Sequence, residues 1–291
     1  STFKVVVVAG ALEDNVVNLH DKFDCENGRF VYGNRSLRDD HPFDILTVEG
    51  IIGKSSNIGA AKIAILMGQK RLHHWVTSFG FGTKTGISLP GEADGIFRPV
   101  ERWSGISITR IPMGHEIACT PLQMAMAMAA VANGGSLMQP KIVDRLVDQN
   151  GTVVIKYPVK EVARVISRET SAEMVQALKT AASTNGTAVK AQLGYYTVAG
   201  KTGTAQKIVN GRYVRNKHYS SFIGFFPADN PELCISVALD EPKNGYYGGA
   251  AAAPIFQQIA ERAANYLAIE PEKIPTLLSN ASGPGPQRRV N

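Results

Sequence analysis

The sequence has little cysteine, no long apolar segment and no dense run of one charge. Its three cysteines, Cys25, Cys119 and Cys234, are far apart and odd in number, which excludes a CxxC metal pair and a framework of disulfides. No stretch of 18 or more apolar residues is uninterrupted, so no segment is predicted to cross a bilayer as a helix. The net charge is +6, yet no basic run stands out apart from Arg288-Arg289, so nucleic acid is not an expected partner. No signal peptide or internal repeat is recognised.

What remains is the composition of a globular chain, with 44% hydrophobic and 19% charged residues over 291 positions. This length can bury a sizeable core, and we expect one large domain over residues 1–275. From Thr276 onward the sequence is rich in Ser, Gly and Pro, so residues 276–291 are predicted to form a disordered tail.

Three short motifs occur in a fixed order along the chain. They are Ser1-Thr2-Phe3-Lys4, then Ser55-Ser56-Asn57, then Lys201-Thr202-Gly203-Thr204. Read as SxxK, SxN and KTGT, they supply a nucleophile, a base, a proton relay and an anion site. Each motif alone is weak, because its few fixed residues occur by chance in a chain of this length. Their order predicts serine acyl transfer on a substrate with a carboxylate next to the scissile bond.

The first motif places a lysine one helical turn after a serine, so both side chains lie on one face. The apolar run Val5–Leu12 that follows indicates a buried helix. A lysine that begins such a helix is desolvated and lies near the positive end of the helix dipole, and both effects lower its pKa. A neutral Lys4 could then take the Ser1 proton, and a nearby Lys201 would lower the pKa further. The alternative is a plain N-cap at Ser1 and a solvated lysine.

The second and third motifs each have a competing match elsewhere in the sequence. Ser183-Thr184-Asn185 also fits SxN, but chain order favours Ser55 and Asn57. Ser55 could relay a proton, and the amide of Asn57 could hold the substrate backbone. The alternative is that both residues only cap a helix. Lys84-Thr85-Gly86 also fits KTG, but it lies among glycines in a predicted loop. Lys201–Thr204 instead begins a β-hairpin whose turn is Asn210-Gly211. There Gly203 permits close approach of a substrate backbone, while Lys201, Thr202 and Thr204 form a compact carboxylate site.

The set SxxK, SxN and KTG is typical of penicillin-binding proteins and serine β-lactamases. The segment Gly80–Glu92 resembles the loop that follows SxN in class B (monofunctional) penicillin-binding proteins. Lys217–Pro227 and Gly245–Ala250 resemble the segments after KTG in that family, and Lys201–Lys207 is similar to its division and sporulation branch. The resemblance covers most of residues 1–268.

The resemblance implies an α+β fold, in which an antiparallel sheet is flanked by helices and joined to an all-helical lobe. In this family the first helix and two strands of the domain precede the serine, whereas Ser1 begins this sequence. We therefore expect a sheet without its N-terminal strands, and a membrane anchor in a segment absent from this chain. The expected location is the extracytoplasmic face of the bacterial plasma membrane.

The resemblance also implies a peptidoglycan D,D-transpeptidase. Ser1 would attack the D-Ala–D-Ala amide of a stem peptide, Lys4 would accept the proton, and Ser55 would pass it to the leaving D-Ala. The amides of Ser1 and Thr204 would hold the oxyanion, and Lys201, Thr202 and Thr204 would hold the terminal carboxylate. Stem peptides, β-lactams as covalent inhibitors, and a cell-division or sporulation membrane complex are the implied partners. No organic cofactor and no metal are implied.

Three alternatives stay open. A serine β-lactamase of this fold would need a base that activates water for deacylation. A β-lactam sensor domain would acylate without cross-linking. An N-terminal nucleophile hydrolase would use the α-amine of Ser1 as its base, although that class does not explain the two later motifs.

The sequence also predicts the main elements around the motifs. Helices are expected from Ser1, over Thr47–Phe79, Pro121–Ala132, Ser171–Ala182 and Ala253–Leu267. Irregular β structure is expected over Ile142–Val159, and strands over Tyr219–Phe226 and Leu233–Leu239, while His20–Asp44 is predicted to be loop-rich. His115 and Glu116 are expected to begin a helix-like run and to pack. Tyr246 and Tyr247 are expected at the rim of the cleft.

Overall fold

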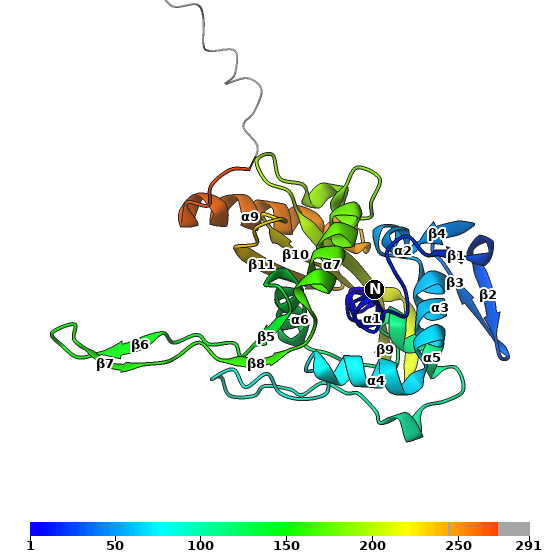
Figure 1. Ribbon diagram of the computed structural model, residues 1–291, viewed down its shortest axis with the longest axis horizontal. Helices are drawn as coiled ribbons and strands as arrows, with labels where there is room; N and C mark the ends of the chain where they lie inside the picture. Colours follow the sequence, from blue (N-terminus) through cyan, green and yellow to red (C-terminus); the bar gives the residue numbers. More distant parts are fainter. Residues whose placement is uncertain (244, 273–291) are drawn as a thin grey trace, which may run out of the picture.

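The computed structural model describes residues 1–243 and 245–272. Its centre is an antiparallel sheet with the strand order β11-β10-β9, formed by Leu233–Asp240, Arg212–Phe226 and Ala199–Val209 (Figure 1). The predicted hairpin is confirmed, since Asn210 and Gly211 both have positive φ angles, 51° and 74°, as a tight primed turn requires. The prediction of a separate strand starting at Tyr219 was wrong, because β10 is continuous from Arg212 and passes a bulge between Tyr213 and His218.

Alternate residues of β10 pack into two separate cores. Phe222 and Phe226 belong to a cluster that includes Phe256 of α9 (Ala253–Leu267), which covers one face of the sheet as predicted. Ile223 and Phe225 belong to the larger cluster on the other face. The helices of that cluster that contact the sheet are α6 (Pro121–Ala132) and α7 (Arg168–Ala182), and α1 (Lys4–Glu13) packs against α7. The period of two along a strand thus creates both layers.

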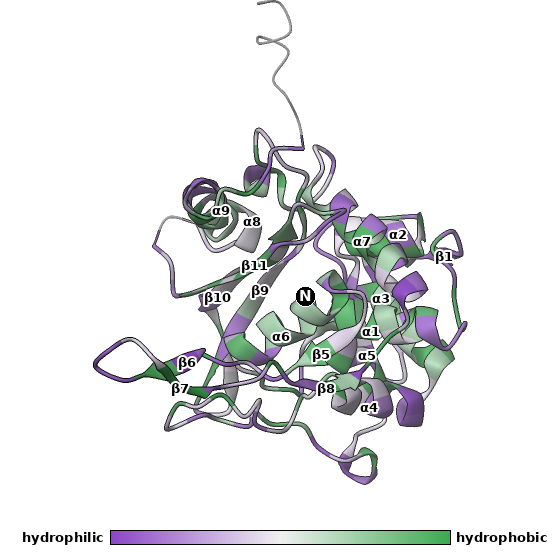
Figure 2. Ribbon diagram, turned by 60° about the vertical axis from the view of Figure 1, so that its left-hand side comes forward, coloured by the Kyte–Doolittle hydropathy of each residue, from purple (hydrophilic) through white to green (hydrophobic). Residues whose placement is uncertain are grey.

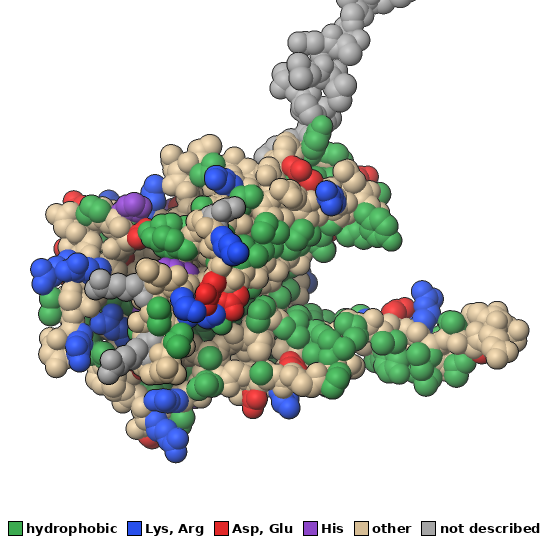
Figure 3. Space-filling view, turned by 180° about the vertical axis from the view of Figure 1, so that it is seen from behind, with side chains coloured by type: hydrophobic (Ala, Val, Ile, Leu, Met, Phe, Trp, Pro, Cys, Tyr) green, Lys and Arg blue, Asp and Glu red, His purple; other side chains and the backbone are tan. Residues whose placement is uncertain are grey.

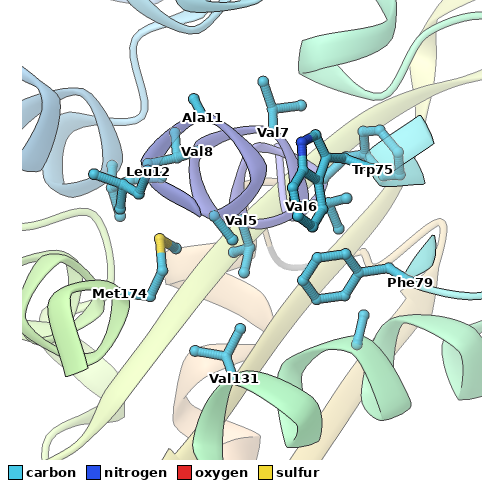
Figure 4. Packing of buried hydrophobic residues seen from close by; sticks show 14 of the residues in the cluster. Val5, Val6, Val7, Val8, Ala11, Leu12, Trp75, Phe79, Val131 and Met174 are labelled. Carbon is cyan, nitrogen blue, oxygen red and sulfur yellow. The ribbon is translucent and has the colours of Figure 1, made fainter. Parts of the chain in front are cut away.

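Helix α1 lies in the middle of the molecule. Every residue from Lys4 to Leu12 is buried, and Figure 2 shows hydrophobic colouring on α1 and on the helices beside it. Its valines lie in one cluster with Trp75, Val131 and Met174, which come from three other helices, and with Phe79 (Figure 4). Four consecutive valines are poor helix formers, so burial rather than intrinsic propensity stabilises this helix.

The second lobe is mainly helical, as the resemblance implied. Its helices are α2 (Val48–Lys54), α3 (Asn57–Met67), α4 (Gln69–Ser78) and α5 (Ser107–Arg110). The predicted loop-rich stretch His20–Asp44 carries short strands that were not expected. These are β1 (Lys22–Asp24), which pairs with β4 (Ile45–Thr47), and β2 (Arg29–Tyr32), which pairs with β3 (Arg35–Arg38). Short 3-10 turns occur at η1 (Glu26–Gly28), η2 (Val100–Arg102), η3 (Ile111–Met113) and η4 (Val189–Ala191).

A long two-stranded arm projects from the body over residues 139–160 (Figures 1 and 3). Its base is β5 (Ser136–Met138) paired with β8 (Glu161–Arg164), and its outer part is β6 (Arg145–Val147) paired with β7 (Val153–Lys156). This confirms the expected β structure over Ile142–Val159. Every residue of β6 and β7 is exposed, apolar ones included.

Other boundaries follow from capping. Helix α6 begins after Thr120, whose side chain forms a capping box with Gln123, and has the predicted ends. Helix α7 begins at Arg168, earlier than predicted, because Ser167 is its N-cap. Helix α8 (Gly248–Ala251) was not predicted. The predicted tail, residues 276–291, lies outside the described residues. Within the described part, no helix combines the length and the apolar character that a membrane span needs.

Candidate active site

The three motifs come together at one place, although they lie on separate elements. Lys4 is the first residue of α1 and Ser1 precedes that helix, Ser55 and Asn57 are at the junction of α2 and α3, and Lys201 is near the start of β9. Lys4 Nζ donates to Ser1 Oγ at 2.9 Å, to Asn57 Oδ1 at 2.8 Å, and to Ser55 at its backbone oxygen (2.7 Å) and Oγ (3.1 Å). The structure therefore brings together the two motifs that chain order selected.

Both lysines of the site are completely buried. Burial lowers the pKa of Lys4 to about 7, although the charge of Asp39 acts in the opposite direction. Burial, followed by the neighbouring charge of Lys4, also lowers the pKa of Lys201 well below its ordinary value. These are the two effects that destabilise an ammonium group inside a protein. The solvated lysine that the sequence left as an alternative is thus wrong.

Ser55 is held between the two lysines by the backbone. It ends α2 in a left-handed conformation with φ of 61°, which turns the chain sharply into α3. Its Oγ accepts from Lys4 Nζ at 3.1 Å and from Lys201 Nζ at 2.8 Å. Because that oxygen already accepts from two amines, its own proton is left to be donated toward the cleft.

Asp39 fixes the second motif, and sequence reasoning missed it. Its carboxylate accepts from Ser56 Oγ at 2.6 Å, from the backbone nitrogen of Asn57, and from that of Ile58 at 3.0 Å. Helix α3 has no acidic residue in its first turn, so Asp39 supplies the negative charge that a helix N-terminus favours. A first turn without Asp or Glu is the one feature of the sequence that suggests a capping carboxylate from elsewhere in the chain, but it does not show that this residue is Asp39.

The amide of Asn57 is held at both of its polar atoms, which leaves one Nδ2 proton for a ligand. Its Oδ1 accepts from Lys4, and its Nδ2 donates to the carbonyl oxygen of Arg38 at 3.0 Å. The strand β3 and the residue after it thus hold both the backbone and the side chain of Asn57. The competing match Ser183–Asn185 follows α7 instead. There the carbonyl of Asn185 accepts from Lys54 at 2.7 Å.

In the third motif, the hydroxyl groups of Thr202 and Thr204 are held by residues outside the motif. Thr202 Oγ1 lies 2.9 Å from Thr187 Oγ1, a residue that sequence reasoning missed, and Thr204 Oγ1 accepts from the nitrogen of Gly248 at 3.0 Å. That bond leaves the Thr204 proton free for a ligand. A side chain at Gly203 would meet Ser221 Oγ at 2.4 Å and Thr2 Cγ2 at 3.1 Å, so the strand packs directly against the nucleophile motif. The competing Lys84 lies exposed in a loop, as predicted.

A cleft of about 1480 Å³ between the sheet and the helical lobe is lined by Ser1, Ser55, Asn57, Thr202 and Thr204. As expected, Tyr246 and Tyr247 stand at its rim, where His218 and the two tyrosines form a continuous stack with ring separations of 4.4 and 4.5 Å. Tyr247 donates its hydroxyl to Asp40 Oδ1 at 3.1 Å, which joins the two walls.

The position of His115 corrects another prediction. His115 and Glu116 do not begin a helix; they follow the turn η3, and Glu116 has a positive φ of 60°. The His115 ring lines the cleft and stacks on Tyr213 of β10, 5.1 Å away. Nearby, the backbone nitrogen of Ser1 donates to the carbonyl of Met113 at 3.2 Å. The oxyanion role given to that nitrogen stays a prediction.

The sequence matches the penicillin-binding protein transpeptidase domain over residues 1–261. It is 38% identical over 280 residues to "Stage V sporulation protein D" of Bacillus subtilis, an alignment that covers 94% of this chain and 43% of that protein. It is 32% identical over 278 residues to "Peptidoglycan D,D-transpeptidase FtsI" of Escherichia coli, covering 95% of this chain and 45% of that protein. The chain thus spans less than half the length of these two relatives.

Solved structures agree in fold. The transpeptidase domain of penicillin-binding protein 3 from Burkholderia pseudomallei superposes with a TM-score of 0.85 at 32% identity, covering 94% of this chain and 80% of that one. Penicillin-binding protein 3 from Mycobacterium tuberculosis, solved with aztreonam, has a TM-score of 0.86 at 29% identity, covering 94% and 63% of the two chains. The α+β fold implied by the resemblance is therefore confirmed, and the chain belongs to the penicillin-binding protein transpeptidase family, in its class B division and sporulation branch.

Proposed function

We propose that this chain is a D,D-transpeptidase that cross-links peptidoglycan stem peptides through an acyl-enzyme on Ser1. The observation that carries the proposal is the buried amine of Lys4, which lies 2.9 Å from Ser1 Oγ and has a pKa lowered to about 7. A base with a pKa near the working pH is suited to activating a hydroxyl group.

Acylation follows from this geometry. Ser1 Oγ attacks the carbonyl carbon of the D-Ala–D-Ala amide, and its proton passes to the neutral amine of Lys4. Ser55, which contacts both Lys4 and Lys201, donates its proton to the leaving nitrogen and is reprotonated by Lys4. The C–N bond then breaks, and D-Ala leaves as an amine. The backbone nitrogens of Ser1 and Thr204 are assigned to the oxyanion, as preorganised donors.

Substrate binding is assigned to the two walls of the cleft. Lys201 and the hydroxyls of Thr202 and Thr204 bind the terminal carboxylate, while Gly203 permits the close approach of the donor backbone. Asn57 orients the donor from the opposite wall. An amine of a neighbouring stem peptide then attacks the acyl-enzyme and releases Ser1 as a free hydroxyl. A β-lactam carries the same carboxylate and acylates Ser1 in place of the donor.

The names of the relatives support a role in the bacterial envelope. One is named for sporulation and another is named a peptidoglycan D,D-transpeptidase. We assign this domain, taken as residues 1–275, to the extracytoplasmic side of the plasma membrane and to a division or sporulation complex.

The decisive experiment is intact-protein mass spectrometry after incubation with a penicillin, followed by peptide mapping. We expect one stable adduct on Ser1, none with Ser1→Ala, and at least ~10³-fold slower acylation with Lys4→Met. Lys84→Met, at the competing KTG match, should react like the wild type. An adduct on any other residue, or one that survives Ser1→Ala, would overturn the assignment.

The alternatives predict different outcomes in the same experiment. Rapid release of hydrolysed penicillin indicates a β-lactamase. A stable adduct in a protein that forms no cross-linked product from stem pentapeptide and an amine acceptor indicates a sensor domain. An N-terminal nucleophile hydrolase would tolerate Lys4→Met, because its base is the α-amine.

A further inference from the structure

The cleft extends well past the carboxylate end of the site. Thr202, Thr204 and Gln206 all line it, at alternate positions of β9, so its long axis follows that strand. At about 3.3 Å per residue, Thr202 and Gln206 are about 13 Å apart. On the proposed function, the terminal carboxylate of the donor lies at Lys201 and Thr202. The residues that precede the D-Ala pair must then extend toward Gln206.

Two guanidinium groups stand on the opposite wall, Arg38 and Arg110, and both line the cleft. Arg38 ends β3, and the Nη2 of Arg110 donates to the carbonyl of Ser36, two residues earlier on the same strand, at 3.2 Å. This contact places Arg110 beside β3, so the two groups lie near one another on the helical-lobe wall.

The position of Arg110 near the cleft floor has independent support. Its charge acts on both rings of the stack that joins the walls there: burial and the charge of Glu116 raise the pKa of Tyr213, and the charge of Arg110 acts in the opposite direction. In His115, burial first and then neighbouring positive charges, Arg110 among them, lower the pKa to about 4. The imidazole is therefore neutral near pH 7 and does not itself repel or attract a ligand charge.

The acidic groups on this wall are already engaged. Asp39 caps α3, Asp40 accepts from Tyr247, and Glu116 accepts from the hydroxyl of Ser107. Among the described residues, neither Arg38 nor Arg110 forms an ion pair within 4 Å. The guanidinium groups thus keep donors free for a ligand, and arginine is the side chain best suited to a carboxylate.

We propose that Arg110, together with Arg38, forms a second carboxylate subsite, which binds an acidic group on the part of the donor that precedes the D-Ala pair. The enzyme would then favour donor stem peptides in which that carboxylate is free over those in which it is amidated. This inference rests on the proposed function, because that function sets the direction of the donor in the cleft.

A matched pair of penicillins tests this subsite. One compound has a 6-acylamino side chain that ends in a carboxylate (glutaryl), and the other ends in the primary amide of the same chain. Both share the ring carboxylate that engages Lys201 and Thr202. We expect the wild type to be acylated about 10-fold faster by the acid than by the amide, the gain of one charge-assisted contact. The second-order rate constant of acylation on Ser1 is measured for each compound.

The variants locate the effect. Arg110→Gln should lower the ratio by slowing only the acid, and the double variant Arg38→Gln/Arg110→Gln should bring it to about 1. Arg110→Lys, which keeps the charge but not the fork of donors, should give a ratio between those of the wild type and Arg110→Gln. Arg71→Gln, on the exposed face of α4, should keep the wild-type ratio. The rate with the amide compound reports whether each variant is folded.

Two results would overturn the subsite: equal rates for acid and amide in the wild type, or a ratio that persists in Arg110→Gln. In both, acylation of Ser1 still occurs, so the proposed function stands. If neither compound acylates Ser1 in the wild type, the proposed function fails and the subsite fails with it.

Discussion

At the residue scale, the central feature is a lysine with too many acceptors for its protons. Lys4 Nζ lies within 3.1 Å of four oxygens, whereas an ammonium group has three protons and a neutral amine has two. In the neutral amine one contact must reverse its direction, and the Ser1 hydroxyl can do so because it carries a proton. The same geometry therefore holds Lys4 in both of its protonation states.

The acylation rate should follow the protonation of this lysine. Because the neutral form is the base, the second-order rate constant for penicillin acylation should fall as the pH drops below about 7 and reach a plateau above it. Stopped-flow or quenched mass spectrometry between pH 5.5 and 9 measures the profile. The rate at each pH is corrected for adduct that is lost by hydrolysis of the ester on Ser1. A rate that stays flat down to pH 5.5 would contradict a neutral Lys4 as base.

The residues that could be predicted from the sequence are those in the ordered motifs. Ser1, Lys4, Ser55, Asn57 and Lys201 meet as expected, because their chemistry depends on short spacings within each motif. Asp39 and Thr187 could not be predicted. Each makes a side-chain contact with a motif 15 or more residues away, and no local pattern marks either residue.

At the element scale, the N-terminus of α3 is as important as the motif that it carries. Ser56 is the N-cap, its Oγ accepts from the nitrogen of Gly59 at 2.9 Å, and Asp39 holds both Ser56 and the first backbone nitrogens. The cap thus sets where Asn57 stands relative to Lys4. The position of Ser55 and Asn57 is a property of this helix end.

Asp39→Ala should therefore weaken both folding and acylation. Loss of a helix cap and its charge should lower the free energy of unfolding by about 1–2 kcal/mol. Acylation should slow about 10- to 100-fold because the relay is displaced. Urea unfolding and acylation rates measure the two effects, and Asp44→Ala, an exposed acid nearby, is the control.

The pH profile separates a positioning role from simple destabilisation. The charge of Asp39 raises the pKa of Lys4, so its removal should shift the midpoint of the acylation profile to lower pH. An unchanged midpoint in Asp39→Ala would mean that Asp39 only stabilises the fold.

The ends of a helix could be predicted where the capping residues lie next to it in the sequence. The ends of strands were missed, because they depend on pairing with another segment of the chain. The ends of α6 follow from Thr120 and from Asn133-Gly134, which lie beside the helix. The strands within His20–Asp44 are three or four residues long and were not predicted, because so short a segment has too few alternations to show a pattern. Strand β10 was divided in two because the bulge before His218 interrupts its alternation.

At the scale of the whole molecule, the arm is distinct from the rest. The fold class could be predicted from the motif order and the resemblance, but nothing in the sequence indicated that residues 142–158 would project into solvent. Their valines and isoleucines resemble those of a buried strand, yet Val154 is 65% exposed and Val147 is 55% exposed. Composition alone does not distinguish the two situations.

Removal of the outer arm should leave the domain intact. If residues 142–158 are replaced by a short Gly-Ser turn, the pairing of β5 with β8 remains, and no core side chain is lost. We expect unfolding free energy within ~1 kcal/mol of wild type, unchanged acylation of Ser1, and less aggregation on heating. Chemical unfolding and light scattering measure these. A loss of several kcal/mol would show that the arm supports the core.

The burial of α1 also limits how this domain can change under selection. The base Lys4 begins, and the nucleophile Ser1 directly precedes, a helix in which every residue from Lys4 to Leu12 is enclosed. Trp75 is packed so tightly over Gly10 that even a methyl group has no room. Few substitutions on that helix can alter reactivity without unfolding the protein. Adaptation to an inhibitor must therefore arise in the exposed walls of the cleft, around Asp40, Tyr246 and Tyr247, where side chains can change while the chemistry is inherited intact.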